Sequence, residues 1–254
     1  MHTLSVEGLE VRYGRTVAVR NVSFTVQRGE IFGLIGPNGA GKTSTLAVVE
    51  GLLAPSAGKV RVLGMDPRKD ARRAKASIGV QLQSTAFQPD LVLTELVQLY
   101  AGLYGVRLGA PEARQRLDDA GLGEAARKRA QELSGGQRQR LSLLIASIHD
   151  PDLLLLDEPT TGLDPQSRRE LWQRVEALRT EGRSVLLTTH SMEEAAALSN
   201  RIGILVRGAL VALDTPETLV RQYAEDPRVR RVARGAVTLE DVFLALSGQE
   251  EVSA

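Results

Sequence analysis

The chain begins with two stretches in which apolar and polar residues alternate. In "LSVEGLEV" the apolar positions are Leu4, Val6, Leu9 and Val11, with a slip of one residue at Gly8. A second alternating run, "VAVRNVSFTV", follows shortly afterwards. A period of two residues is typical of strands with one buried and one exposed face. We therefore expect two neighbouring strands of a partly exposed antiparallel sheet.

The rest of the chain combines short apolar runs with helical periodicity. The runs "GEIFGLIG", "DLLLLD" and "SVLLTT" predict strands, "KVRVLG" and "SIGVQL" are further strand candidates, and "RIGILVRG" and "ALVAL" predict a pair of short strands. Helical patterns occupy "KTSTLAVVEGL", residues 165–180 and the segment from Ser191. Strands that alternate with helices indicate an α/β fold with a parallel sheet.

Residues 84–150 have a different pattern, in which helices are broken by glycine and proline. We interpret them as a helical subdomain inserted into a core formed by residues 1–83 and 151–220, and residues 221–254 as a short C-terminal extension. In the extension, "TLEDVFLALSG" predicts a final packing helix, because Leu239, Val242, Phe243 and Leu246 fall at helical spacing. For the arginine cluster before it we favour a solvated turn over a ligand site: Arg228, Arg230, Arg231 and Arg234.

Composition narrows the possible function classes. The chain has 254 residues, 43% of them hydrophobic, which is enough for a well-buried core. It carries 32 Lys plus Arg against 31 Asp plus Glu, so no general charge attracts nucleic acid or anionic membrane, although a local patch is compatible with this balance. There is no cysteine, and His2, His149 and His190 are too scattered for an obvious metal site, so we expect any metal to arrive with a ligand.

The stretch "GPNGAGKT" matches the phosphate-binding P-loop in full, with a strand before it and a helix after it. The glycines let backbone N–H groups point at phosphate oxygens, Lys42 reaches the terminal phosphates, and the Thr43 hydroxyl can ligate Mg²⁺. The alternative is a chance glycine-rich turn. We assign nucleotide binding to Gly36, Pro37, Asn38, Gly39, Ala40, Gly41, Lys42, Thr43 and Ser44.

Acidic and polar residues follow other buried runs. Asp157 ends "LLLLD", where a carboxylate emerges at the carboxyl edge of the sheet and can hold Mg²⁺. Glu158 beside it is the candidate general base, the alternative being an ordinary surface glutamate. Gln83 follows "IGVQL" as a ligand of Mg²⁺ and of the attacking water, with Gln81 as a rival. His190 follows "SVLLTT", where an imidazole can contact the terminal phosphate.

A second glycine pair lies in "LSGGQ". Ser134 and Gln137 have the spacing of a capping box, and Leu141, Leu144, Ile145 and Ile148 form the buried stripe of the following helix. A well-capped helix without a ligand is the alternative to an anion site. Gly135 and Gly136 each cost helix propensity of about 1 kcal/mol, which favours close approach of this backbone to another group.

Together these motifs resemble the ATP-binding subunit of an ABC transporter over about residues 3–220, and the drug and antibiotic exporter group in particular. The motifs are "GPNGAGKT", Gln83, "LSGGQ", "LLLLDE", "GLD" and His190, in the family's order and spacing. The resemblance implies a P-loop NTPase core of the RecA-like type, with ATP and Mg²⁺ as cofactors. It also implies that Tyr13 stacks on adenine and that Asp164 links two active sites.

The family resemblance further implies a head-to-tail dimer, in which each ATP lies between the P-loop of one subunit and the "LSGGQ" of the other. We expect a homodimer, an integral membrane permease as partner, and a position on the cytoplasmic side of the membrane. Export is favoured over import of small solutes. A soluble ABC ATPase acting on nucleic acid or ribosomes and a P-loop kinase are the remaining alternatives, and no nucleic-acid partner is expected.

Overall fold

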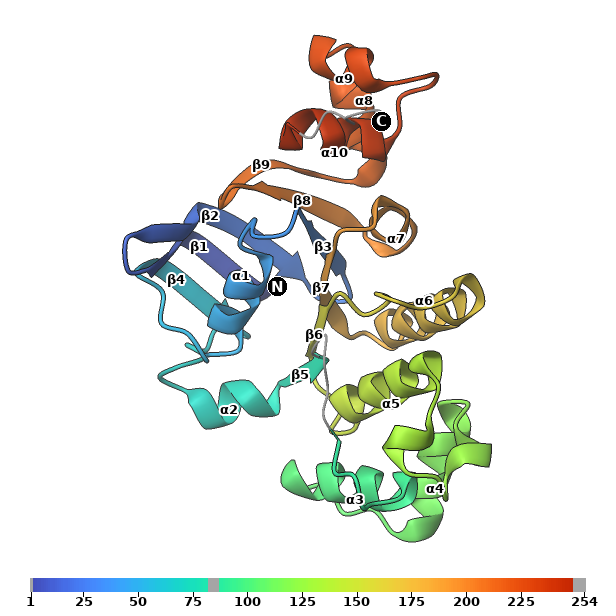
Figure 1. The fold of residues 1–254 in the computed structure, drawn as a ribbon. Helices are drawn as coiled ribbons and strands as arrows, with labels where there is room; N and C mark the ends of the chain where they lie inside the picture. The colour runs from blue at the N-terminus through green and yellow to red at the C-terminus, as the bar shows by residue number, and fades with distance from the viewer. Residues whose placement is uncertain (1, 82–86, 249–254) are drawn as a thin grey trace.

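The computed structural model describes residues 2–81 and 87–248, which form a large mixed sheet, a small antiparallel sheet and surrounding helices (Figure 1). The strands are β1 His2–Tyr13, β2 Thr16–Gln27, β3 Ile31–Ile35, β4 Ala57–Val62, β5 Ile78–Gln81, β6 Leu153–Asp157, β7 Ser184–Thr189, β8 Arg201–Val206 and β9 Ala209–Asp214. The helices are α1 Lys42–Val49, α2 Ala71–Ala76, α3 Leu93–Leu103, α4 Ala110–Asp119, α5 Gly135–Ser147, α6 Pro165–Thr180, α7 Met192–Leu198, α8 Pro216–Tyr223, α9 Pro227–Val232 and α10 Leu239–Ser247, with short 3₁₀ turns η1 Gly123–Ala125 and η2 Ala130–Glu132.

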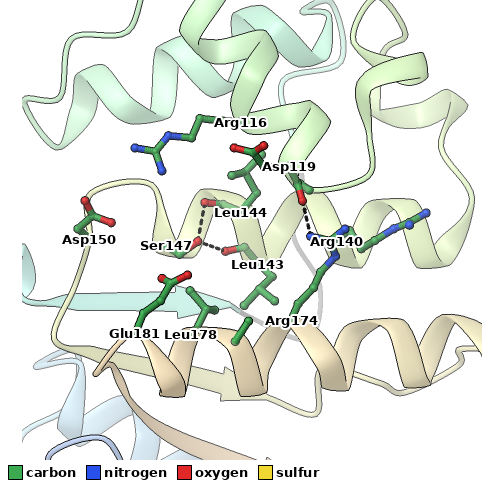
Figure 2. A pocket seen from close by; sticks show the side chains of 12 residues that line it. Arg116, Asp119, Arg140, Leu143, Leu144, Ser147, Asp150, Arg174, Leu178 and Glu181 are labelled. Atoms are coloured by element: carbon green, nitrogen blue, oxygen red, sulfur yellow. Dashed lines mark hydrogen bonds between the residues drawn. The ribbon is translucent and has the colours of Figure 1, made fainter.

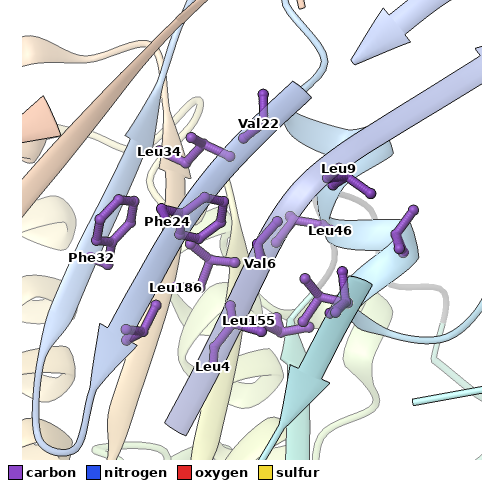
Figure 3. Close-up of a cluster of buried hydrophobic side chains, with 14 of the residues drawn as sticks. Leu4, Val6, Leu9, Val22, Phe24, Phe32, Leu34, Leu46, Leu155 and Leu186 are labelled. Atoms are coloured by element: carbon purple, nitrogen blue, oxygen red, sulfur yellow. The ribbon is translucent and has the colours of Figure 1, made fainter. Parts of the chain in front are cut away.

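The small sheet has the order β2-β1-β4 and is antiparallel, as the alternating patterns predict. The slip at Gly8 is a shift in register between Val6 and Leu9, and Gly8 has a φ of +56°. The apolar faces of β1 and β2 cover α1 and part of the large sheet (Figure 3). Phe24 stacks on Phe32 with ring centroids 4.9 Å apart, so this contact joins the two sheets.

The large sheet has the order β5-β6-β7-β3-β8-β9 and is parallel except for β9, which confirms the predicted α/β class. The carboxyl ends of β3, β7 and β6 lie side by side, because Ile35 pairs with Thr189 and Asp157 pairs with Thr188. This register brings the loops after all three strands to one edge of the sheet, where ligands of such folds bind.

Helices α3, α4 and α5 lie together at the lower end of the molecule in Figure 1. Leu141 and Ile145 of α5 and its C-cap residue Ile148 belong to the hydrophobic cluster of these helices, as the predicted stripe requires, and Leu144 is partly buried against it. The opposite face of α5 is buried as well, since Leu143 packs with residues of β6, β7 and α6. Helix α5 therefore connects the helical region to the main sheet.

The C-terminal segment forms α8, α9 and α10, whose apolar residues pack on β8 and α7, so the predicted packing helix is confirmed. The turn predicted for the arginine cluster is wrong, because most of it lies on α9. Asp226 caps this helix and Pro227 occupies its first turn, both strong helix-start signals. Arg228 pairs with Asp226 at 2.8 Å. No helix in the described ranges is long and apolar enough to cross a membrane.

Candidate functional site

The loop from Gly36 to Lys42 has a backbone path that requires glycine at two positions. A Cβ on Gly36 would lie 2.3 Å from the carbonyl oxygen of Leu205, and one on Gly41 would lie 2.5 Å from that of Ala18. Gly41 also has a φ of +105° and precedes the first residue of α1. The loop thus delivers Lys42 to a helix N-terminus, where the first N–H groups lack partners within the helix and the helix dipole favours an anion.

A cavity of about 630 Å³ opens over this loop. It is lined by seven of the nine predicted loop residues, by Ala18 of β2, and by three residues that follow β6 and β7 and are far away in sequence: Ala18, Asn38, Gly39, Ala40, Gly41, Lys42, Thr43, Ser44, Glu158, Thr161 and His190. Tyr13 lies at its edge, where its side-chain hydroxyl is 3.3 Å from Ser44 Oγ. Because Tyr13 is 53% exposed, its ring is accessible to a planar ligand.

Lys42 is the buried cation of the cavity, with 5% of its surface exposed. Its Nζ donates to the carbonyl oxygens of Gly36 at 2.7 Å and Pro37 at 3.3 Å, and it lies 3.7 Å from Glu158 Oε1. Burial lowers the pKa of this amine, and the negative charges of Glu158 and Asp157 partly offset the effect. A phosphate would therefore meet an ammonium group that is held in place by its own loop.

Glu158 joins the loop to the end of β7. Its Oε2 lies 3.2 Å from His190 Nδ1 and accepts a hydrogen bond of 3.2 Å from Thr161 Oγ1. Its backbone has a φ of +48°, which is unusual for a residue with a Cβ. The backbone N–H donates to the Thr188 carbonyl at 3.0 Å, which stabilises this conformation. The two candidate catalytic side chains Glu158 and His190 are thus in direct contact.

Asp157 precedes the cavity-lining Glu158 but is not itself among the residues that line the cavity; it is 8% exposed and accepts a hydrogen bond from Thr188 Oγ1. Thr188 was not predicted as a site residue, although its place at the end of "SVLLTT" pairs it with Asp157. Glu50 was also missed. Burial, and secondly the negative charge of Asp157, raise its pKa to about 7.

The candidate magnesium ligands have suitable chemistry but do not form a metal cage by themselves. Asp157 supplies a carboxylate, and Thr43 lies exposed on the first turn of α1, so both offer the hard oxygen donors that Mg²⁺ prefers. No group of three or more His, Cys, Asp or Glu residues capable of holding a metal occurs within residues 2–81 and 87–248. This donor set fits a cation that keeps waters and phosphate oxygens in its shell.

The two glutamine candidates have different outcomes. Gln83 lies outside the described residues. Gln81 is 1% exposed, and its Nε2 donates to Gln139 Oε1 of α5 at 2.7 Å. This bond links the end of β5 to the helix that begins at "LSGGQ".

The capping box of α5 is confirmed. Gln137 N–H donates to Ser134 Oγ at 3.2 Å, and Ser134 N–H donates to Gln137 Oε1 at 3.0 Å. The two glycines differ in their surroundings. A Cβ on Gly136 would lie 2.5 Å from Ser167 Oγ, whereas one on Gly135 would have no neighbour closer than 3.9 Å. Internal packing therefore explains Gly136, and only Gly135 presents open backbone to an external ligand.

Asp164 caps α6. Its Oδ1 accepts from the N–H groups of Gln166 and Ser167 at 3.0 and 2.9 Å, and its Oδ2 accepts from Ser167 Oγ at 2.6 Å. These bonds, the Ser167 hydroxyl first, lower the pKa of the Asp164 carboxyl. In the described chain, neither Asp164 nor residues 134–137 line the P-loop cavity.

A second cavity, of about 280 Å³, lies between α4, α5 and α6 (Figure 2). Arg174 donates to the Asp119 carbonyl oxygen at 2.8 Å across it, and Arg140 pairs with Glu170 at 3.1 Å. Its lining contains three arginines and three carboxylates: Arg116, Arg140, Arg174, Asp119, Asp150 and Glu181. The charges balance, so the cavity favours neither an anion nor a cation. We interpret it as part of the junction between the helical region and the core.

Comparison with known proteins agrees with the motif pattern. Residues 19–161 match the family described as "ABC transporter". The chain is 37% identical over 252 residues to the Nod factor export ATP-binding protein I of Burkholderia lata. This match covers 98% of this chain and 83% of that protein. It is 40% identical to the "Probable multidrug ABC transporter ATP-binding protein YbhF" of Escherichia coli, covering 96% of this chain but 41% of that protein.

Solved structures show the same fold. An ATP-binding subunit of an ABC transporter is 26% identical, with a TM-score of 0.84, and the match covers 96% of this chain and 99% of that one. An ATP-binding cassette in its ADP conformation is 21% identical with a TM-score of 0.78, covering 91% and 98%. This second likeness concerns the fold alone.

Proposed function

The chain belongs to the ABC transporter family and is an ATPase, and from this premise we propose that it powers export through a separate membrane permease. The observation that carries the proposal is the cavity in which Lys42, Glu158 and His190 meet over the P-loop. Relatives named for Nod factor export and for multidrug transport favour export. Import of small solutes is the alternative.

The site residues would divide the work of ATP hydrolysis. Lys42 and the N–H groups of the loop and first turn of α1 hold the phosphates, and Tyr13 contacts the base. Glu158 takes a proton from the attacking water, and the Glu158–His190 contact orients both side chains. Thr43 and Asp157 would hold Mg²⁺, which supplies charge neutralisation on the phosphate oxygens when it is bound.

A second copy of the chain would complete each site. Ser134 and Gly135 are exposed at the N-terminus of α5, a position suited to an anion, yet they do not line the cavity of their own chain. We propose that they contact the terminal phosphate of ATP bound to the partner. Asp164, at the start of α6 next to α5, would contribute to the same interface.

The permease would dock on α3. Leu99, Leu103 and Tyr104 expose 39%, 71% and 42% of their surfaces on or just after this helix. Phe87 precedes α3 in the chain and packs edge-to-face on Tyr100 of that helix with ring centroids 6.3 Å apart. Through this contact a movement of the chain at Phe87 would reach the docking surface. The chain would then be a peripheral protein on the cytoplasmic side of the membrane.

A mixing experiment tests the composite site. Lys42→Ala removes the phosphate-binding amine from one chain, and Ser134→Arg blocks the α5 terminus of another. If the site forms between chains, each variant alone lacks ATPase activity, but their mixture regains a fraction of it, because one of the two sites in a mixed dimer is intact. A mixture as inactive as its parts would overturn the shared site while leaving nucleotide binding to the P-loop unaffected.

Co-purification tests the transport role. The permease is expected to be a multi-helix membrane protein, encoded beside this chain, that stimulates ATP hydrolysis when assembled with it. Leu103→Asp on α3 should prevent the assembly without changing nucleotide affinity. A chain that hydrolyses ATP fully and associates instead with ribosomes or nucleic acid would contradict the transport function.

A further inference from the structure

The total charge is nearly balanced, but residues 57–77 form a strongly basic segment. Residues 57–77 contain seven basic side chains and two carboxylates. They run from β4 through a tight turn to α2, and six of the seven basic residues are exposed: Lys59, Arg68, Lys69, Arg72, Arg73 and Lys75. We call these six side chains the α2 surface.

Both carboxylates of the segment are already engaged. Asp66 pairs with Arg61 at 2.9 Å and accepts hydrogen bonds from the N–H groups of Arg68 and Lys69. Asp70 accepts from the N–H of Asp66 at 3.0 Å. Within the described chain, no residue of the α2 surface has a carboxylate oxygen within the 4.0 Å of an ion pair. Lys75 interacts electrostatically with the buried Glu50 at longer range. Seven basic side chains against two carboxylates still leave the segment with an excess of positive charge.

An exposed apolar side chain lies beside this charge. Leu52 is 68% exposed in the loop after α1. That loop abuts the basic turn, because a Cβ on Gly51 would lie 2.4 Å from the Pro67 carbonyl oxygen. A cavity of about 270 Å³ also opens there, lined by Val48 and Val60 together with Lys59, Arg61, Arg68 and Lys69. Basic side chains around an apolar one are typical of protein surfaces that contact the headgroup region of a bilayer.

The place of the α2 surface in the fold agrees with such a contact. In Figure 1, α2 and α3 lie toward the same lower end of the molecule, and the C-terminal helices lie at the opposite end. If the permease docks on α3 as proposed above, this lower end faces the membrane. We propose that the α2 surface binds anionic phospholipid headgroups, with Leu52 at the apolar boundary. The six cations are distributed over a strand, a turn and a helix. Because they do not converge on one point, they suit the many phosphates of a bilayer better than the few carboxylates of a protein segment.

Vesicle flotation with the full chain tests the proposal independently of any permease. The wild-type chain should float with vesicles that contain about one third phosphatidylglycerol in phosphatidylcholine, and not with phosphatidylcholine alone. Flotation should be lost at about 0.5 M salt, where charges are strongly screened. The triple variant Arg68→Gln, Arg72→Gln, Arg73→Gln should bind about a hundredfold more weakly, since each basic residue contributes roughly a fivefold factor.

A matched control removes the same charge at the opposite end. Arg228→Gln, Arg230→Gln, Arg231→Gln changes α9 and should leave vesicle binding within about twofold of wild type. Equal losses in both triple variants would reduce the effect to net charge and overturn the proposal. Absence of wild-type flotation would also overturn it. If, in that case, the α2 variant failed to assemble with the permease, the surface would bind a protein partner instead of lipid. Unchanged ATPase activity of the α2 variant would show that the nucleotide site is intact.

Discussion

His190 Nδ1 lies 3.2 Å from Glu158 Oε2, while the other oxygen of the same carboxylate lies 3.7 Å from Lys42 Nζ. One side chain thus contacts both the phosphate-binding lysine and the histidine at the end of β7. Lys42 also donates to two carbonyl oxygens of its own loop. A phosphate that enters must compete with these partners, so ATP binding would rearrange Glu158 and His190 together.

Glu158→Gln should preserve ATP binding and slow hydrolysis by about a hundredfold or more, because the amide cannot accept a proton from water. We expect the variant to accumulate as an ATP-bound dimer, measured by size-exclusion chromatography with ATP and with ADP. Glu217→Gln, on the exposed surface of α8, is the matched control and should behave as wild type. Unchanged turnover of Glu158→Gln would remove Glu158 from the role of base.

Lys42→Ala should weaken ATP binding by about tenfold or more, since a buried ammonium group aimed at phosphate is lost. Direct calorimetric titration measures this without relying on turnover. Lys42→Arg keeps the charge but not the compact shape, and it should bind ATP more weakly than wild type as well. If the affinity of Lys42→Ala equals that of wild type, the P-loop assignment is wrong.

Gly135→Ala and Gly136→Ala separate a ligand role from a packing role. Gly135→Ala meets open space, so it should leave the melting temperature unchanged or raise it, yet lower ATPase activity if this backbone approaches the partner's nucleotide. Gly136→Ala should lower the melting temperature, because its Cβ meets Ser167 Oγ at 2.5 Å, and the drop should be smaller in a Ser167→Gly background, where that contact is absent, than in the wild-type background. Full activity of Gly135→Ala would contradict close approach at this position.

Much of the site could be predicted because its motifs are local. The P-loop needs only glycines, Lys42 and a strand before a helix, and Asp157 ends a short apolar run whose length favours a buried strand. The capping box of α5 is likewise encoded within four residues. The start signals of α9, Asp226 and Pro227, were present in the sequence as well, so the turn predicted there was an avoidable error.

The contacts between distant segments could not be predicted in this way. The bond from Thr188 to Asp157 depends on the register of β7 against β6, which no local pattern specifies. The packing reason for Gly136 depends on how α6 crosses α5 and brings Ser167 against it. The buried second face of α5 escaped notice because Leu143 lies off the stripe whose spacing signals an amphipathic helix.

The ring of His149 stacks on that of Tyr104 with centroids 3.7 Å apart, and its Nε2 lies 3.1 Å from the Ile78 carbonyl oxygen. Burial lowers the pKa of His149 below its ordinary 6.5, so the unfolded chain binds this proton more readily than the folded one. The stability that the neutral ring contributes is therefore present above pH 6.5 and lost as the pH falls through the folded pKa.

His149→Phe keeps a ring for stacking, and its melting temperature should fall less than that of wild type between about pH 7.5 and about pH 5.5. The exposed His2 provides the control His2→Gln, which should retain the wild-type pH dependence. An identical pH dependence in His149→Phe and wild type would mean that another group causes the loss.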